Sequence, residues 1–186
     1  MKRMLILITL LIMIIPFVFS DGAGGFYSGY QVSSYPFVDG DGFENNNMGL
    51  FYTGGFGYGI NRNNIITGGF GYTLFESKDG ENPLGGFGGV INGVRILRYP
   101  INISFMSWTG FGGISTGLYT SDSENGSFAV SEELTLEVGF PLFRWFSPTI
   151  YAGYQVIGNL GTGKPFEDFL SYTSVIGFRF QWGKFY

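Results

Sequence analysis

The feature that most constrains this chain is an alternation of apolar residues with small or polar ones. Within 128–140, one parity carries Phe, Val and Leu, with Glu132 as the exception, and the other carries Ser, Glu, Thr and Gly. Segment 170–186 alternates in the same way. A period of two residues is typical of a β-strand whose two faces meet different surroundings. Both segments are therefore predicted to be strands.

Two more segments alternate around a shared motif. The sequence TGGFGY stands at 53–58 and again at 67–72, inside the alternating segments 48–60 and 65–76. The residues NRNN at 61–64 separate the two segments, and their composition predicts a tight turn. In both copies Phe and Tyr share one parity, while Gly and Thr mostly share the other. The two copies are therefore predicted to lie on the two arms of a hairpin.

Weaker alternation predicts four further strands, at 24–35, 84–97, 101–117 and 149–158. In 101–117 the apolar parity changes between Phe105 and Met106, which predicts a bulge or a twist at that point. In 84–97 neither parity is the more apolar one. The sequence therefore leaves open whether Arg95 points inward or outward.

The connections between these eight strands alternate in character. Polar and mostly acidic connections occupy 36–47, 77–83, 120–127 and 159–169. The other connections, which are mostly shorter, occupy 61–64, 98–100 and 141–148. This alternation describes an antiparallel meander, and eight such strands can close on themselves. We therefore predict an all-β fold, an eight-stranded antiparallel up-and-down β-barrel.

The first twenty residues differ from the rest of the chain. Two basic residues precede an apolar run over 4–19, and the run ends in a Val-Phe-Ser sequence that a signal peptidase tolerates. A retained membrane anchor is the alternative, but the run is shorter than the ~20 apolar residues that span a bilayer. We predict a cleaved signal peptide at 1–20 and a barrel domain at 21–186.

Composition indicates which face of the barrel points outward. Charged residues make up 13% of the chain, whereas a soluble surface typically carries roughly a quarter or more. Small residues opposite the aromatic ones suit the narrow interior of an eight-stranded barrel. Trp145, Phe146 and Trp182 fall near the predicted short-turn end, where an aromatic membrane-interface girdle is expected. We therefore predict a transmembrane barrel whose aromatics, including those of TGGFGY, face lipid and whose glycines face the interior.

These features resemble the small bacterial outer-membrane barrels of the OmpA-barrel and OmpX-like type. The resemblance rests on the signal peptide, the eight segments over 24–186, the alternating connections and the ending VIGFRFQWGKFY. It implies an outer-membrane location, lipid as a partner, and a C-terminal signal for the barrel-assembly machinery formed by Phe178, Phe180, Trp182 and Tyr186. A final Tyr in place of Phe, and Lys184 within the alternation, depart from the family's usual ending.

Motifs that could carry chemistry are weak. Neither TGGFGY copy has the glycine spacing of a dinucleotide fingerprint. The sequence GNLGTGKP at 158–165 has Pro165 where a phosphate loop needs Ser or Thr. The chain has no histidine and no cysteine, which rules out a Ser-His-Asp arrangement. Acidic residues at 39–44 and 121–125 lack EF-hand spacing and are expected to form turns. We predict no catalytic residue, no metal site and no cofactor.

The net charge of the chain and the positions of its charged residues restrict the possible partners and sites. Removal of Lys2 and Arg3 with the signal peptide leaves 8 basic against 14 acidic residues, a net charge of −6, which argues against a nucleic-acid partner. Three charged residues fall on the polar parity of predicted strands: Glu133, Glu137 and Arg179. Because buried charges need partners, we hypothesise that they form an ion-paired plug in the barrel interior.

The expected role is non-enzymatic, either in envelope structure or in surface interaction through the acidic loops. The sequence identifies no surface ligand. Two alternatives stay open: a narrow pore or conduit for small apolar solutes, and a soluble periplasmic barrel that binds a ligand.

Overall fold

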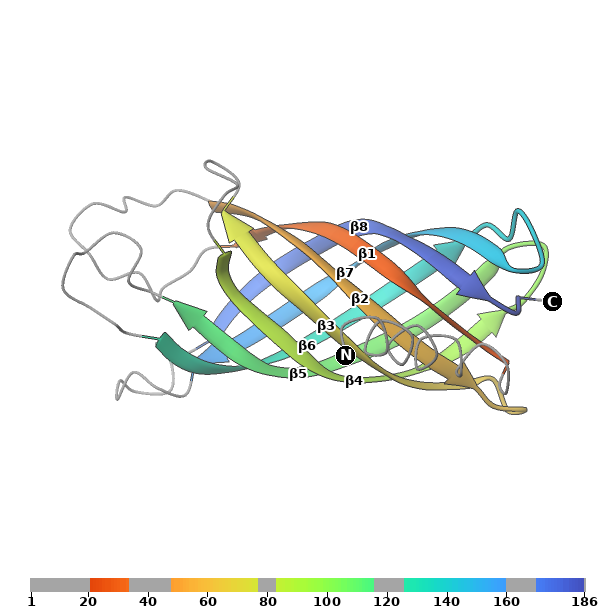
Figure 1. Ribbon diagram of the computed structural model, residues 1–186, viewed down its shortest axis with the longest axis horizontal. Coiled ribbons are helices and arrows are strands. Elements are labelled where there is room, and N and C mark those ends of the chain that lie inside the picture. The colour runs from red at the N-terminus through yellow and green to blue at the C-terminus, as the bar shows by residue number, and fades with distance from the viewer. Residues whose placement is uncertain (1–20, 34–47, 77–82, 116–125, 160–169, 186) are drawn as a thin grey trace, which may run out of the picture.

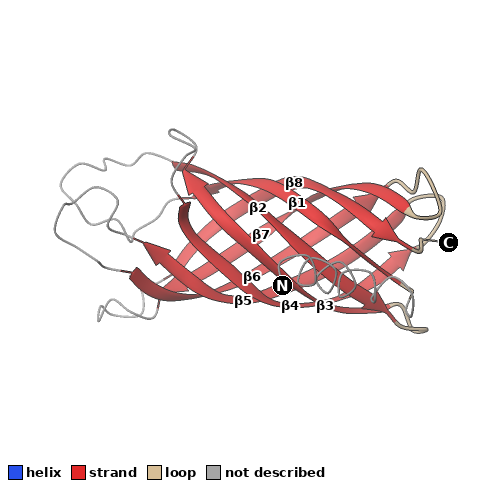
Figure 2. Cartoon of the chain, in the orientation of Figure 1, coloured by secondary structure: helices blue, strands red, loops and turns tan. Residues whose placement is uncertain are grey.

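The chain forms one sheet that closes on itself. The structure is a computed structural model, and it describes residues 21–33, 48–76, 83–115, 126–159 and 170–185. Its eight strands are β1 (Gly22–Ser33), β2 (Met48–Ile60), β3 (Ile65–Glu76), β4 (Pro83–Leu97), β5 (Asn102–Ser115), β6 (Gly126–Gly139), β7 (Phe146–Asn159) and β8 (Leu170–Gly183). Each strand pairs with its neighbours in chain order, and β1 also pairs with β8, so the sheet is a closed barrel (Figure 1, Figure 2).

The predicted all-β, eight-stranded, antiparallel up-and-down barrel is confirmed. Predicted segments 48–60 and 65–76 coincide with β2 and β3, and the other six strands differ from prediction only at their ends. The start of β1 and the end of β8 lie at the same end of the barrel as the connections that follow β2, β4 and β6 (Figure 1). No helix among the described residues is long and apolar enough to cross a membrane.

The predicted turn at 61–64 joins β2 to β3 through two asparagines. The Asn61 side chain accepts hydrogen bonds from the backbone N–H groups of Asn63 and Ile65, at 2.9 and 3.0 Å. Asn64 has a φ of 62°, a left-handed conformation that asparagine tolerates better than most residues. The turn thereby fixes the register of the hairpin that carries both copies of the motif.

The two TGGFGY copies lie side by side on this hairpin, but their predicted orientation is wrong. Phe56 pairs with Phe70, and Gly55 pairs with Gly71. The aromatic parity of β2 points into the barrel, where Phe56 and Tyr58 are each 8% exposed. The glycine parity, which includes the exposed Gly55, lies on the outer wall. The motif therefore presents rings to the interior and bare backbone to the outside.

The need to fill the interior explains this orientation. Trp108 of β5 points inward, and its ring centroid lies 5.8 Å from that of Phe56, 5.2 Å from that of Phe70 and 5.4 Å from that of Tyr27. The interior of an eight-stranded barrel is just wide enough for side chains to fill it. If β2 and β3 turned their glycines inward, this side of the barrel would lose the rings that fill it.

The strands β6 and β8 have the arrangement that the sequence predicts. Their apolar parity faces outward, as the exposed side chains of Leu136 and Phe178 show. Their polar parity faces inward and is buried, including Glu133 and Arg179. The wall thus has one sector with small outward residues, on β2 and β3, and another with large apolar outward residues, on β5 to β8.

In β5 the structure differs from the predicted bulge, and in β4 it decides the direction of Arg95, which the sequence left open. The register between β5 and β6 runs unbroken past Phe105 and Met106, so the bulge expected there is absent from this pair. The irregularity lies in β4, between Arg95 and Leu97. Arg95 is buried at 5% exposure, and its guanidinium donates to Asn64 Oδ1 at 3.3 Å. The parity changes in β5 because Met106 and Trp108 fill the interior while Phe105 faces out.

The two described residues after β8 make different contacts at the short-turn end. Phe185 is 2% exposed, and its carbonyl accepts a hydrogen bond from Arg98 Nε at 3.3 Å. Lys184 points the other way and lies 2.9 Å from the Asp21 carboxylate in an exposed ion pair. The residue that interrupts the predicted alternation therefore ties the last strand to the start of the first.

Gly29 provides a test of the packed interior. A Cβ at Gly29 would overlap the Tyr52 and Tyr151 side chains, whereas a Cβ at Gly57 on the outer wall would meet open space. We expect Gly29→Ala to lower the free energy of unfolding by ~1–3 kcal/mol, as overpacking does, and Gly57→Ala to leave it unchanged or slightly raised. Urea titration followed by tryptophan fluorescence measures both, and equal midpoints for the two variants would contradict the packing described here.

Candidate functional site in the barrel interior

The guanidinium of Arg179 is the centre of the interior. The residue lies on β8 with its side chain directed into the barrel, and it is 0% exposed. An arginine remains charged at any ordinary pH, and removing such a charge from water costs several kcal/mol unless partners replace the water. The groups around Arg179 therefore decide whether the interior is stable.

Two carboxylates of β6 provide the opposite charge. Arg179 Nη2 lies 3.6 Å from Glu133 Oε1, and Arg179 Nη1 contacts Glu137 Oε1. Both carboxylates are buried, and the Thr135 hydroxyl between them donates to Glu137 Oε1 at 3.3 Å. The structure therefore brings together all three residues that the sequence analysis assigned to a plug. Their role in closing the barrel stays a prediction.

Aromatic rings provide the remaining surroundings of the guanidinium. Its Cζ atom lies 3.8 Å from the centroid of the Trp108 ring and 4.1 Å from that of Tyr151. A guanidinium over an aromatic face is attracted by the ring quadrupole, and the attraction is larger where water is excluded. Arg179 thus contacts the carboxylates of β6 together with aromatic residues of β5 and β7, the two strands that flank β6.

Hydrogen bonds between side chains also cross the interior. Tyr151 Oη donates to Tyr52 Oη at 2.8 Å, which joins β7 to β2. Gln155 Nε2 donates to Tyr72 Oη at 2.8 Å, which joins β7 to β3. A third bond at 2.8 Å runs from Tyr58 Oη of β2 to Gln181 Oε1 of β8. These bridges tie strands that are not neighbours in the sheet, so side-chain hydrogen bonds cross the interior at three places.

The two carboxylates of the cluster are shielded from solvent. Glu133 and Glu137 are 3% and 2% exposed, and both lie against the guanidinium of Arg179. Among the described residues, no three His, Cys, Asp or Glu side chains lie close enough together to hold a metal ion. The cluster therefore compensates charge that is buried inside the barrel.

The predicted girdle residues gather on the outer wall at the short-turn end. The ring of Phe146 lies 5.9 Å from that of Trp145 and 5.4 Å from that of Trp182. Phe178 and Phe180, from the predicted assembly signal, are exposed on the same outward parity of β8. Tyr186, the last residue of that signal, lies outside the described residues.

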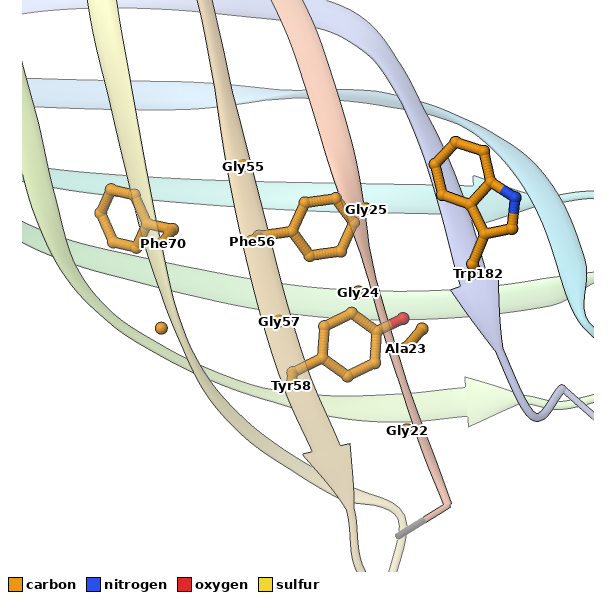
Figure 3. A pocket seen from close by; sticks show the side chains of 11 residues that line it. Gly22, Ala23, Gly24, Gly25, Gly55, Phe56, Gly57, Tyr58, Phe70 and Trp182 are labelled. Carbon is orange, nitrogen blue, oxygen red and sulfur yellow. The ribbon is translucent and has the colours of Figure 1, made fainter. Parts of the chain in front are cut away.

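A groove of about 620 Å³ opens on the outer wall over β1, β2 and β3. Its lining includes the outward-facing Gly55, Gly57 and Gly69, with Trp182 at one side (Figure 3). Rings of the interior, among them Phe56, are part of its floor. The groove exists because these positions lack side chains, and its surface is mostly apolar.

Sequence reasoning missed the aromatic partners of Arg179. It assigned the aromatic residues of β2 and β3 to the outside, and it attributed the parity change between Phe105 and Met106 to a bulge or a twist. The available signal was that β5 carries large apolar residues on both parities, which indicates that its inner face is not lined by small residues.

Three sequence features fall on residues that the structure does not describe, wholly or in large part. They are the predicted signal peptide at 1–20, the acidic residues at 39–44 and 121–125, and the phosphate-loop-like sequence at 158–165.

No protein-family model matches this chain, and no curated protein sequence matches it either. The interpretation of the site therefore rests on its geometry.

Removal of the central cation should be costly. Arg179→Ala leaves two buried carboxylates uncompensated, and we expect it to lower the free energy of unfolding by ~3–5 kcal/mol. The control Lys184→Ala removes an exposed ion pair, which is worth ~0–1 kcal/mol. Replacing all three residues, as Arg179→Met with Glu133→Gln and Glu137→Gln, should restore most of the loss. Denaturant titration measures the free energy of unfolding of each variant. An unchanged midpoint for Arg179→Ala would rule out a stabilising ion-paired cluster.

Proposed function

We propose that this chain is a bacterial outer-membrane β-barrel protein with a non-enzymatic role, in envelope structure or in surface interaction through its acidic loops. Outer-membrane lipid is its surroundings, and the barrel-assembly machinery is its partner during biogenesis. No cofactor and no nucleic acid take part in this function.

The observation that carries the proposal is the distribution of polarity across the wall. A soluble barrel keeps charge outside, whereas a membrane barrel turns an apolar band outward and polar residues inward. Here Arg179, Glu133 and Glu137 are buried inside. The outer wall over β5 to β8 carries large exposed apolar side chains, among them Phe105, Phe111, Phe128, Leu134, Ile150, Ile176 and Phe178. In water such an exterior would be an aggregation site.

Two further features support the proposal. The aromatic cluster of Trp145, Phe146 and Trp182 at one end suits the level of lipid headgroups. The basic and apolar residues at 1–20 suit export. Neither feature identifies a surface ligand. The proposal therefore specifies the membrane location and the use of the acidic loops, without a ligand.

Cell fractionation with gel mobility tests the location. We expect the full-length protein in the outer-membrane fraction, extractable only with detergent, because its apolar wall requires lipid or detergent around it. The unheated protein should migrate differently from the boiled protein, as a compact barrel does. Recovery from the periplasm without detergent would instead support the soluble ligand-binding barrel.

Conductance distinguishes a closed barrel from a narrow pore. The purified wild-type protein in a planar bilayer should give no stepwise current, because the Tyr151–Tyr52 bridge and the Arg179 cluster fill the interior. Arg179→Ala should increase ion leakage because it removes a large buried side chain and its charge from the interior. Persistent steps from the wild-type protein would favour the pore, and equal leakage from the two proteins would contradict the plug.

A further inference from the structure

Glu132 is a carboxylate on the apolar outer wall. It shares the outward parity of β6 with Leu134 and Leu136, and it pairs with Thr109 of β5 and Val156 of β7. A charged residue on the lipid-facing side of a barrel is destabilising and is often functional. The interior cluster does not use Glu132, so its position needs a separate explanation.

Two hydroxyls hold the carboxylate in place. Ser107 Oγ donates to Glu132 Oε1 at 2.6 Å, and Thr109 Oγ1 donates to Oε2 at 2.6 Å. Both donors lie on the outward parity of β5, two residues apart. An ionised carboxylate has about four acceptor positions, so two remain after these bonds. Ser107 and Thr109 thus fix the orientation of the Glu132 carboxylate, and the Glu132 side chain stays partly exposed.

The depth of Glu132 follows from the strand geometry. Phe140, exposed just beyond the short-turn end of β6, is eight residues away. With a rise of ~3.3 Å per residue and a tilt of ~40°, the distance along the barrel axis is roughly 20 Å. The apolar band of a membrane barrel is about 25 Å tall. If the proposed membrane location holds, Glu132 lies in the loop-side half of that band.

We propose that Glu132, held by Ser107 and Thr109, binds the ammonium group of a cationic amphiphile in the membrane. Charge complementarity favours a cation, and a primary ammonium offers three compact N–H donors to the remaining acceptor positions. The exposed Leu134 and Leu136 continue from Glu132 toward the short-turn end. They offer an apolar surface to an alkyl chain that runs toward the middle of the membrane.

A second copy of the chain fits this surface less well. Two copies related by a twofold axis along the membrane normal would place their Glu132 carboxylates at the same depth, where like charges repel. The described basic side chains do not supply the missing cation. Arg62, Arg98, Arg144 and Lys184 lie at the short-turn end, while Arg95 and Arg179 are buried.

The experiment uses the full-length mature barrel in phosphatidylcholine nanodiscs, with dodecylammonium as the probe and calorimetric titration as the measurement. We expect Glu132→Gln to weaken binding at least about tenfold, as the loss of a charged hydrogen-bond partner does. Ser107→Ala with Thr109→Val should weaken it to a smaller extent. Asp21→Asn, which removes a carboxylate outside the wall, is the matched control and should bind as the wild type does. Dodecyltrimethylammonium, which has no N–H donor, should bind more weakly than dodecylammonium.

Three results would overturn the proposal: equal affinity of Glu132→Gln and wild type, no binding to wild type beyond that of empty nanodiscs, or a wild-type dimer that Glu132→Gln converts to a monomer. The last result would assign the surface to self-association. Fractionation and gel mobility of Glu132→Gln keep this test separate from the membrane location. The proposed membrane location is supported as long as the barrel fractionates with the outer membrane. This holds whether or not the wild type or the variant binds the probe.

Discussion

The rest of this structure depends on the small space that eight strands enclose, because every inward side chain has to fill it without leaving a charge unpaired. Rings from β2, β3 and β5 fill much of it, and the carboxylates of β6 lie beside them, with Glu133 paired to Trp108. Arg179 satisfies both kinds of group at once. Its flat guanidinium covers the Trp108 ring at 3.8 Å, while its nitrogens contact the carboxylates of Glu133 and Glu137. Lysine has no comparable flat face, so the choice of arginine follows from surroundings that combine rings with carboxylates.

The strands of this barrel could be predicted from the sequence far better than their faces. Alternation and turn composition locate all eight strands, because a period of two depends only on local pattern. The direction of each face depends on what lies across the interior, which is a non-local property. Glu133 and Arg179 were assigned to the inside correctly because a charged parity opposes a strongly apolar one. Phe56 and Tyr58 were assigned wrongly because glycine and aromatic parities each suit either side.

The same difficulty applies to the site. Two carboxylates and one arginine on polar parities were enough to suggest an ion-paired cluster, and the structure brings them into contact. Trp108 and Tyr151 could not be assigned to the cluster, since nothing local in β5 or β7 shows that they face the same guanidinium. Glu132 illustrates the opposite case. It was visible as an exception to its alternation, but its hydroxyl partners come from another strand and are revealed only by the register of β5 against β6.

The pairing of β1 with β8 has a consequence for how such a chain is made. Strand β1 is synthesised before the other seven strands, but it can pair with its second neighbour only when β8 is available. The sheet therefore cannot close until β8 has been made. Contacts between such distant residues form slowly, and an unpaired strand edge invites association with other chains. Until the sheet closes, the unpaired edge of β1 can therefore associate with other chains, and this interval includes the synthesis of all the later strands. The ion pair between Asp21 and Lys184, at 2.9 Å, lies beside this closing pair of strands.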